Sequence, residues 1–391
     1  MKIVSVVGAR PNFMKIAPLL KEWRQFPAIE HILVHSGQHY DDQLSTSFFR
    51  DLGLPDPGIN LQVGSGSHAW QTAEIMKRLE PVLIETCPDL VTVVGDVNST
   101  LAAALTAAKL NLKIVHVEAG LRSYDTSMPE EINRKLTDVL ADFLFVTEQE
   151  GVENLRREGI DPARIFLVGN VMIDSLLSCR AAAARSTILC DLGLIGGDAR
   201  VRPYGILTLH RPSNVDRLTT LKGILASVHA IAQDLPVFFP IHPRTRERIR
   251  SLGLENYFAA SGATRRGLVV IQPLGYLDFL CLMDHARLAL TDSGGIQEET
   301  TVLGVPCLTL RENTERPATI SEGTNRLVGL DPDGILKAAQ QVLRDERRPA
   351  RLPKLWDGQA SKRIVRILLE HVQPDLLLKS KGVSVTPVCS G

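Results

Sequence analysis

The 391-residue sequence has few aromatic residues and no excess of either charge. Aromatic residues make up 5%, and 44 Lys and Arg residues are balanced by 44 Asp and Glu residues. A protein whose main partner is nucleic acid or an anionic membrane usually carries a clear positive excess. The balance therefore predicts neither partner, although local arginines and helix ends can still hold an anionic small molecule.

Cysteine is scarce and scattered along the chain. The six cysteines form no CxxC pair and have no spacing that is typical of metal ligands. We expect them to be reduced thiols, and we expect no bound metal. Their positions are Cys87, Cys179, Cys190, Cys281, Cys307 and Cys389.

Long hydrophobic runs are missing as well. The first residues, MKIVSVVGARP, contain one lysine and a mostly apolar run that is too short for a signal peptide. No stretch approaches the ~18 continuous apolar residues of a membrane helix. We therefore expect a soluble, cytoplasmic protein. With 44% hydrophobic residues, the chain can form two or three buried cores.

Short β-branched runs alternate with longer amphipathic segments. Buried runs without polar alternation, separated by helical periods, are typical of parallel strands joined by helices. The pattern predicts an α/β protein with two Rossmann-like domains. The predicted strands are 2–7, 31–36, 90–96, 113–118, 143–147, 164–169, 204–210, 237–242, 268–273, 288–293 and 305–310.

Two pairs of similar segments occur in the same order in the two halves of the chain. VVGARPN (6–12) and LTLHRPSN (207–214) each join a strand to a basic turn with proline. VVGDVNST (93–100) and LTDSGGIQEE (290–299) each end a strand with Asp. The repeated order predicts two similar domains whose strand ends face a ligand cleft.

The predicted boundary lies near the middle of the chain. Residues 178–203 contain an alanine run, glycines and arginines without a clear strand, and we expect a connecting helix and linker there. The first domain is predicted at 1–177, together with a C-terminal helix at about 359–378. The second domain is predicted at 178–358.

TDSGGIQEET is the best candidate for a phosphate site. Ser293 can cap a helix, and Gly294 and Gly295 allow backbone N–H groups to approach an anion closely. Glu299, one turn into the helix, can accept hydrogen bonds from ribose hydroxyls. An ordinary capped helix with solvated glutamates explains the same residues about as well, so the motif alone leaves both interpretations open.

Arg10 and Lys15 place two cations near the N-terminus of another predicted helix. There they oppose the helix dipole, which costs roughly 0.3 kcal/mol or more unless an anion compensates. A bound anion is therefore favoured over a simple surface pair. The chain has no GxGxxG after the first strand and no Walker A lysine motif, so NAD and ATP have little support.

The stretch HVEAGLRSYDTSMPEE raises the question of acid catalysis. Asp96 and Glu118 end neighbouring hydrophobic strands, and Glu130 opens a helix. Taken alone, Glu130 is expected to stabilise the helix dipole and to pair with Arg134 at i+4. Its combination with Asp96 and Glu118 at neighbouring strand ends favours a catalytic cluster instead.

The helix after Pro129 has a clear hydrophobic period. Its apolar stripe is of the kind that faces a core. The stripe consists of Ile132, Leu136, Val139, Leu140 and Phe143. The other face carries Glu130, Asn133, Arg134 and Thr137.

Histidines give weaker signals. His210 and Arg211 follow a predicted strand, where they would face the cleft. His31 and His35 have the i, i+4 spacing of metal ligands, but HILVHS is typical of a strand and lacks the acid of HExxH. The sequence therefore predicts no metal site.

Together these motifs resemble the non-hydrolysing UDP-N-acetylglucosamine 2-epimerases. The resemblance extends to about residue 330 and includes GARPNFMKIAPL, SGQHYD, GDVNST, HVEAGLRS, MPEEINR, LHRPSNVD, HPRTR, PLGY, TDSGGIQEE and TERP. It implies a glycosyltransferase-B-like fold, a C-terminal helix that crosses back onto the first domain, and a homodimer. The implied reaction interconverts UDP-GlcNAc and UDP-ManNAc without a cofactor, by elimination of UDP to 2-acetamidoglucal and re-addition.

The resemblance also implies roles for individual residues, without deciding which carboxylate is acid and which is base. The catalytic residues that it implies are Asp96, Glu118, Glu130 and His210. The implied substrate-binding residues are Arg10, Lys15, Leu274, Ser293, Gly294, Gly295, Glu299 and Arg316.

Two positions depart from the family pattern. Ser213 stands where many bacterial members have a glutamate that helps to bind a second, activating UDP-GlcNAc, so we expect that activation to be absent. Trp70 stands where a polar residue is expected. Both departures are compatible with a modified substrate such as a UDP-diacetamido-uronic acid. A hydrolysing epimerase that releases ManNAc, a glycosyltransferase with this fold and a non-catalytic nucleotide-sugar sensor would also fit these motifs.

Overall fold

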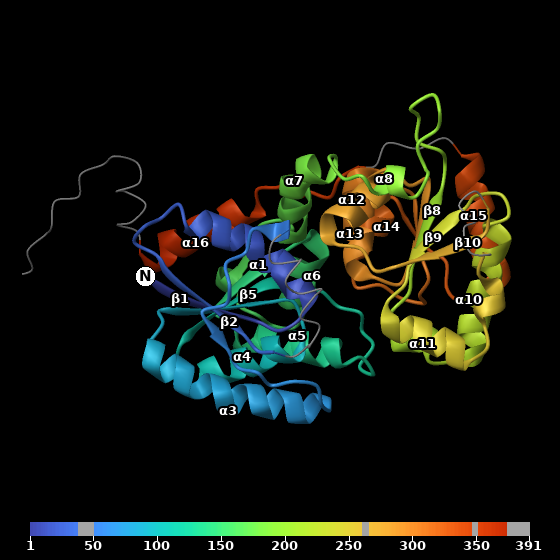
Figure 1. Cartoon of the computed structure of the whole chain (residues 1–391). Coiled ribbons are helices and arrows are strands. Elements are labelled where there is room, and N and C mark those ends of the chain that lie inside the picture. The colour runs from blue at the N-terminus through green and yellow to red at the C-terminus, as the bar shows by residue number, and fades with distance from the viewer. Residues whose placement is uncertain (38–50, 260–265, 346–350, 374–391) are drawn as a thin grey trace, which may run out of the picture. The chain divides into compact units, whose positions relative to one another are not determined.

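A computed structural model describes residues 1–37, 51–259, 266–345 and 351–373. The chain forms two compact units, Met1–Ser175 with Lys354–Gly391 and Leu176–Pro353. Each unit has its own parallel sheet with helices packed against it (Figure 1). The predicted α/β architecture with two Rossmann-like halves is confirmed.

The first unit contains a seven-stranded sheet in the order β3-β2-β1-β4-β5-β6-β7, with every neighbouring pair parallel. The direction of winding reverses between β1 and β4. In open α/β sheets, ligands bind outside the carboxyl ends of the strands at such a point. The strands are β1 (Lys2–Val7), β2 (Glu30–His35), β3 (Ile59–Asn60), β4 (Leu90–Val94), β5 (Lys113–Ala119), β6 (Phe143–Val146) and β7 (Ile165–Leu167).

Helices cover both faces of this sheet, α1 and α16 on one side and α3, α4 and α5 on the other (Figure 1). Alternate strand residues point to opposite faces, so the sheet takes part in two cores. One core contains Val4, Val6, Val91 and Val93, and the other contains Ile3, Val7, Leu90 and Val94. The helices are α1 (Arg10–Trp23), α3 (His68–Thr86), α4 (Asn98–Lys109), α5 (Pro129–Leu140), α6 (Gln149–Arg157), η1 (Pro162–Arg164) and α16 (Ala360–Val372).

The second unit contains a six-stranded parallel sheet in the order β10-β9-β8-β11-β12-β13, which reverses between β8 and β11. Its strands are β8 (Gly205–Thr208), β9 (Val237–Pro240), β10 (Leu268–Ile271), β11 (Leu288–Thr291), β12 (Cys307–Thr309) and β13 (Asn325–Leu327). Its helices are α8 (Ile188–Asp191), α9 (Pro212–Val215), α10 (Leu218–Ile231), α11 (Pro243–Ser251), η2 (Glu255–Tyr257), α12 (Tyr276–Asp284), α13 (Gly294–Leu303), α14 (Ala318–Ser321) and α15 (Pro332–Arg344).

The predicted strands are all present, and two short ones were missed. β3 has two residues and β13 has three, too few for a recognisable hydrophobic run. The predicted linker at 178–203 has more structure than expected. α7 (Val171–Ala183) runs into it, α8 follows, and Ile195 and Val201 form an antiparallel bridge.

The prediction for the apolar stripe of α5 is wrong in orientation. Ile132, Leu136 and Val139 are 48%, 48% and 59% exposed, so this part of the stripe faces outward, whereas Leu140 packs against a core and Phe143, in β6, is buried. The buried positions of α5 are polar: Glu131, Asn133, Arg134, Thr137 and Asp138. Burial of these groups is tolerated because each makes hydrogen bonds or ion pairs inside the unit. Hydrophobic period alone does not tell which face of a helix turns inward.

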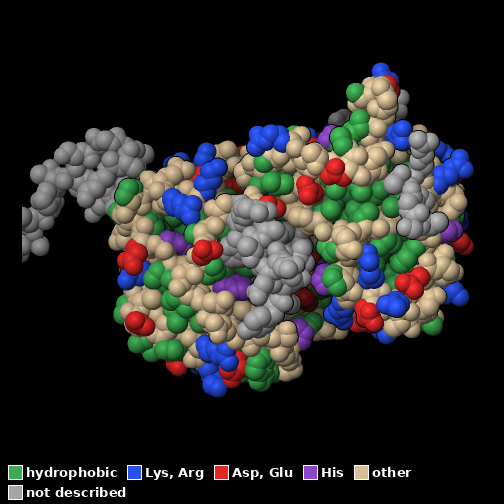
Figure 2. Space-filling view, viewed as in Figure 1, with side chains coloured by type: hydrophobic (Ala, Val, Ile, Leu, Met, Phe, Trp, Pro, Cys, Tyr) green, Lys and Arg blue, Asp and Glu red, His purple; other side chains and the backbone are tan. Residues whose placement is uncertain are grey.

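Charged side chains of both signs are interspersed on the face that Figure 2 draws, wherever described residues form it. That distribution agrees with the balanced composition. Within the ranges that the structure describes, no helix is long and apolar enough to cross a membrane.

His31 gives a pH-dependent contribution to stability. Its ring stacks on Trp23 at a centroid distance of 4.9 Å, and its Nε2 lies 3.0 Å from Ser5 Oγ. Burial, with a smaller effect of Arg24, lowers the pKa of His31 from 6.5 to about 4. The unfolded chain therefore binds this proton more readily between pH 6.5 and 4, and the contribution, full above pH 6.5, is lost as the pH falls to about 4.

We expect His31→Gln to remove this part of the pH dependence. The loss between pH 7 and pH 4 amounts to about 3 kcal/mol of unfolding free energy in the wild type. Urea unfolding followed by circular dichroism across this range measures it for both proteins. Parallel curves for wild type and variant would contradict the assignment.

Candidate active site

The turn between β1 and α1 is tied to the end of β4 by Asn12. Its Oδ1 accepts from the N–H groups of Gly8 at 3.1 Å and Ala9 at 3.0 Å, and its Nδ2 donates to Val94 O at 2.9 Å. A Cβ at Gly8 would lie 1.9 Å from Ser99 Oγ, so only glycine fits. The GARPN turn is therefore built against the point where the sheet reverses.

Glu118 lies at a distorted strand end. The pairing of β5 with β6 shifts register between Val117 and Ala119, and Glu118 itself has a left-handed backbone with φ 74°. Such a φ is costly for a residue with a side chain and persists where the surroundings fix it, often at functional sites. Glu118 is buried and forms an ion pair with Lys15. The anion that offsets Lys15 is therefore, in this structure, a carboxylate of the chain.

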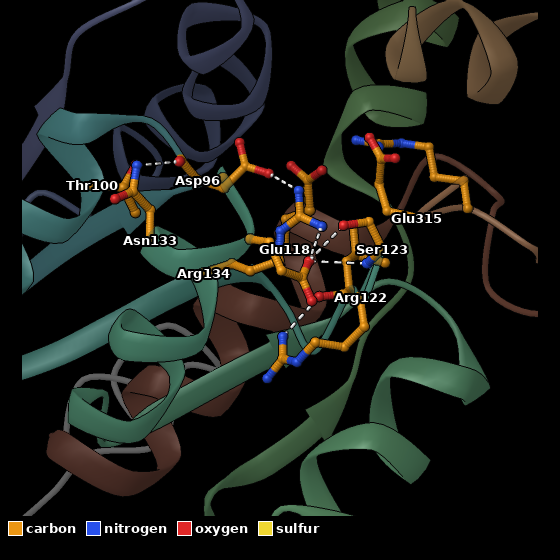
Figure 3. Close-up of polar contacts among 12 residues, drawn as sticks. Asp96, Thr100, Glu118, Arg122, Ser123, Asn133, Arg134 and Glu315 are labelled. Atoms are coloured by element: carbon orange, nitrogen blue, oxygen red, sulfur yellow. Dashed lines mark hydrogen bonds and ion pairs between the residues drawn. The ribbon is translucent and has the colours of Figure 1, made fainter. Parts of the chain in front are cut away.

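Asp96 follows Gly95, whose φ of +69° turns the chain at the end of β4. The Asp96 carboxylate pairs with Arg134, and its backbone oxygen accepts from Asn133 Nδ2 at 2.9 Å (Figure 3). Both partners come from the buried polar face of α5. That face therefore holds in place the turn of Gly95 and Asp96 at the end of β4, which we call the acid turn.

Glu131 is a site residue that the sequence reasoning missed. It is fully buried and accepts from Ser123 N at 2.9 Å, Ser123 Oγ at 3.0 Å and Arg134 Nη1 at 2.9 Å. The expected pairing of Glu130 with Arg134 is wrong, because Arg134 bonds to Glu131 and Asp96 instead. The i, i+3 spacing of Glu131 and Arg134 was the available signal.

Glu130 and Arg10 are less constrained in the structure. Glu130 is half-buried in the first turn of α5. Among the described residues, the structure records no hydrogen-bond or ion-pair partner for its side chain. Arg10 begins α1, but its side chain lies outside what the structure describes.

A buried network of charged groups contacts the acid turn through His116, whose Nε2 lies 2.9 Å from Gly95 O. His116 Nδ1 lies 2.7 Å from Asp138 Oδ1, and Arg122 Nη1 lies 2.7 Å from Asp138 Oδ2. Arg122 also pairs with Glu158. Burial alone would raise the pKa of the Asp138 carboxyl, but His116 and Arg122 hold it below its ordinary value.

His210 sits at the corresponding reversal point of the second sheet. Its side chain is 56% exposed, and its Nδ1 lies 2.8 Å from Asp292 Oδ1. Burial would raise the pKa of Asp292, but His210 and the N–H groups of His210 and Arg211 outweigh it and lower that pKa. Because Asp292 holds Nδ1, the other ring nitrogen is the one available to a ligand.

Three arginines gather around one carboxylate in the same unit. Glu315 pairs with Arg211 at 3.2 Å, Arg311 at 2.8 Å and Arg316 at 2.7 Å. Arg316 also pairs with Glu298 at 2.6 Å. Burial, together with Arg211 and Arg316, lowers the pKa of Arg311 although Glu315 opposes the shift. A concentration of guanidinium groups favours a ligand with several negative oxygens.

The start of α13 lies beside this cluster. Ser293 is the N-cap residue, but its hydroxyl makes no cap hydrogen bond, so that expectation is wrong. A Cβ on Gly294 would lie 2.5 Å from Arg316 Nη1. Gly294 and Gly295 are half-buried in the first turn, where backbone N–H groups have no helical partner.

Glu299 is buried one turn further along α13. Tyr276 donates to its carboxylate at 2.9 Å, and burial first, then Glu299, raises the pKa of Tyr276 well above its ordinary value. Leu274 is half-buried in the connection between β10 and α12. Within the described ranges, no group of three or more His, Cys, Asp and Glu side chains is placed to hold a metal ion.

Comparisons with known proteins agree with this geometry. The family model of UDP-N-acetylglucosamine 2-epimerase matches residues 21–369. A Methanocaldococcus jannaschii UDP-N-acetylglucosamine 2-epimerase is 41% identical over 371 residues, which cover 94% of this chain and 99% of that protein. A Pseudomonas aeruginosa UDP-2,3-diacetamido-2,3-dideoxy-D-glucuronate 2-epimerase is 39% identical over 94% of this chain and 99% of that protein.

A solved structure is similar over the same length. The Methanocaldococcus jannaschii UDP-GlcNAc 2-epimerase in complex with UDP-GlcNAc and UDP has a TM-score of 0.86 and 40% identity, covering 95% of this chain and 100% of that one. These neighbours have the two-domain glycosyltransferase-B-like fold. With the family model across most of the chain and relatives near 40% identity, this protein belongs to the UDP-N-acetylglucosamine 2-epimerase family.

Proposed function

We propose that this protein interconverts UDP-GlcNAc and UDP-ManNAc as a non-hydrolysing 2-epimerase. The observation that carries the proposal is Glu118, an acid held in a left-handed backbone conformation beside Asp96 at the reversal point of the sheet. A strained acid at the ligand-binding edge of an α/β sheet is typical of a functional site. The Methanocaldococcus jannaschii relative was solved with UDP-GlcNAc and UDP.

The reaction needs carboxylates. No carbonyl group acidifies the C2 hydrogen of the sugar, so cleavage of the C1–O bond has to run ahead and builds positive charge at C1. Carboxylates stabilise that charge, and one of them accepts the C2 proton, which contributes ~10²–10⁴-fold. UDP then adds back to the glucal while C2 is protonated from the other face. In our proposal, Asp96, Glu118 and Glu130 share these tasks.

The UDP moiety is assigned to the second unit in this proposal. The first-turn N–H groups of Gly294 and Gly295, the His210 ring and the guanidinium of Arg316 would bind the diphosphate. Glu299, held by Tyr276, would accept from the ribose hydroxyls. The remaining proposed substrate contacts are Arg10, Lys15, Leu274 and Ser293.

An assay in D₂O tests the function and the route. With UDP-GlcNAc, we expect a second UDP-sugar that carries deuterium at C2, because the abstracted proton is replaced from solvent. Phosphorus and proton NMR follow both products. Stoichiometric UDP and free ManNAc would instead show hydrolysis, and a retained C2 hydrogen would show hydride transfer. An unchanged sugar would favour a binding protein or another substrate.

A UDP-diacetamido-uronic acid is the second candidate substrate. The Pseudomonas aeruginosa relative, 39% identical to this chain, carries the name of such an epimerase. Trp70 and Ser213 depart from the pattern expected for the simple sugar, and the expected loss of activation through Ser213 stays a prediction. A ratio of kcat/KM for the two sugars decides between them.

We also propose a homodimer formed through the outward stripe of α5. α4 packs between α3 and α5 on one face of the sheet, so exposed residues of α3 and α5 border the same surface. Exposed large apolar residues on neighbouring helices are typical of an interface, and a two-fold dimer would pair this surface with itself. The exposed large apolar residues of α3 and α5 are Trp70, Ile84, Ile132, Leu136 and Val139.

Leu136→Glu should dissociate this dimer. The charge would be buried without a partner in the interface but would remain solvated in a monomer. Light scattering after size exclusion measures the mass, and Leu218→Glu is the matched control, because Leu218 is also 48% exposed but lies on α10 of the second unit. A monomeric wild type, or an unchanged mass for Leu136→Glu, would refute the proposed interface.

We propose a cytoplasmic location. Five cysteines are free in the described residues, and two of them, Cys87 and Cys190, are exposed. Exposed thiols are typical of proteins in a reducing compartment. Fractionation of the source cells checks this.

A further inference from the structure

His116 is fully buried in β5, directly below the acid turn, and both of its ring nitrogens face hydrogen-bond acceptors. Nδ1 lies 2.7 Å from Asp138 Oδ1, and Nε2 lies 2.9 Å from the backbone oxygen of Gly95. A neutral imidazole has one N–H donor and one acceptor nitrogen. One of these two contacts would therefore set two lone pairs against each other if the ring were neutral.

Asp138 does not resolve the conflict by donating a proton. Its Oδ2 accepts from Arg122 Nη1 at 2.7 Å and from Gly120 N at 3.2 Å, and Oδ1 faces His116. Donors surround the carboxylate, which favours its ionised form. The carbonyl of Gly95 can only accept. Both ring nitrogens of His116 must then carry protons.

The charges around His116 balance only when it is an imidazolium. His116 and Arg122 are opposed by Asp138 on α5 and by Glu158 at the end of α6, which pairs with Arg122 at 2.5 Å. Loss of the His116 proton would leave the fully buried Asp138 with Arg122 as its only cation, and Arg122 also serves Glu158, whose side chain is 31% exposed. The next charged group along the chain from Gly95 is Asp96, which pairs with Arg134.

The protonated His116 affects the site through Gly95, the residue directly before Asp96. Gly95 donates its N–H to Val117 O at 3.0 Å, and its carbonyl accepts from His116, so this peptide is held on both sides. We propose that His116 is a positioning residue: as an imidazolium that donates from both ring nitrogens, it fixes the Gly95 carbonyl and thereby the carboxylate of Asp96. The proposal rests on the 2-epimerase function for its kinetic consequence, but not for its protonation state.

The protonation state is tested on wild-type protein by NMR. With ¹⁵N-labelled histidine, His116 should show two protonated ring nitrogens at pH 7. His116→Gln, which lacks the ring, identifies the signal. One unprotonated ring nitrogen at pH 7 would overturn the proposal, whether or not the protein epimerises UDP-GlcNAc.

Kinetics test the positioning role. We expect His116→Phe, which has no donor, to lower kcat by about 10²-fold, because displacement of a reacting group by about 1 Å costs that much. His116→Gln keeps one donor for the Gly95 carbonyl and should recover part of the rate. KM should stay within about threefold, because UDP is assigned to the second unit. His285→Gln, on the exposed surface of that unit, is the matched histidine control.

A double-mutant cycle separates positioning from general damage. Asp138→Asn removes the carboxylate that holds the imidazolium, so it should lower kcat as His116→Gln does, and the double variant should lose little more. UDP affinity by calorimetry should be unchanged in all three. Full turnover in folded His116→Phe, or additive losses in the double variant, would overturn the role.

Discussion

Glu118→Gln should lower kcat by ~10²-fold or more while leaving UDP affinity nearly unchanged. Glutamine keeps the size of the side chain but can neither stabilise positive charge at C1 nor accept the C2 proton. We expect the variant to retain the register shift between Val117 and Ala119 and the left-handed backbone of the wild type, so the geometry of the strand end should be preserved. Initial rates with UDP-GlcNAc and UDP calorimetry measure the two effects.

The same substitution should also destabilise the protein, for a reason unrelated to catalysis. Lys15 is buried, and its ion pair with Glu118 is the only one recorded for it among the described residues. A buried ammonium that loses its partner costs about 3–5 kcal/mol. Lys15→Met combined with Glu118→Gln removes both charges, so it should recover most of the stability and none of the activity.

Glu153→Gln is the matched control, because it replaces a glutamate by a glutamine outside the site. Glu153 is an exposed glutamate on α6, so its substitution should alter neither rate nor stability. Near-wild-type turnover of folded Glu118→Gln would remove Glu118 from the mechanism. Recovered activity in the double variant would show that the single substitution acted only through the stranded charge of Lys15.

The architecture was largely readable because parallel strands leave strong signals. Runs such as Leu90–Val94 are buried on both faces, and a fully buried parallel strand has no polar alternation. The sequence could not predict which face of α5 is buried. A helix with one apolar and one polar stripe can pack either stripe against a core when the buried polar groups find partners. The buried partner of Glu131 is Arg134 from the same helix, but Ser123 comes from a loop that only the fold brings near.

The site was predicted as a set of residues but not as a set of contacts. Motifs placed Asp96 and Glu118 at strand ends, and the sheet confirms that position. The pairs that fix them, Lys15 with Glu118 and Arg134 with Asp96, join distant segments of the chain. A sequence shows each partner as an ordinary surface charge, because only tertiary structure decides which charges are buried together.

Gly294→Ala should weaken UDP binding by about 10- to 100-fold and leave the acid turn of the first unit intact. A Cβ at this position would lie 2.5 Å from Arg316 Nη1 and 2.7 Å from its Cζ. Arg316 cannot yield freely, because Glu298 holds its Nε at 2.6 Å and Glu315 holds its Nη1 at 2.7 Å. Either the guanidinium or the first turn of α13 must move, and a lost charge-assisted hydrogen bond costs about 1.5–3 kcal/mol.

Calorimetric titration with UDP measures this loss, and Gly197→Ala is its matched control. A Cβ at Gly197 meets nothing within 4 Å, so the same added methyl group should be neutral there. Gly294→Ala and Glu118→Gln should then fail in opposite ways, one losing UDP affinity and the other losing turnover after UDP-sugar is bound. This split is expected because the Arg316 cluster and the acid turn belong to separate units. Unchanged UDP affinity in folded Gly294→Ala would mean that the start of α13 does not bind the diphosphate, and the glycine pair would be no more than a close packing contact with Arg316.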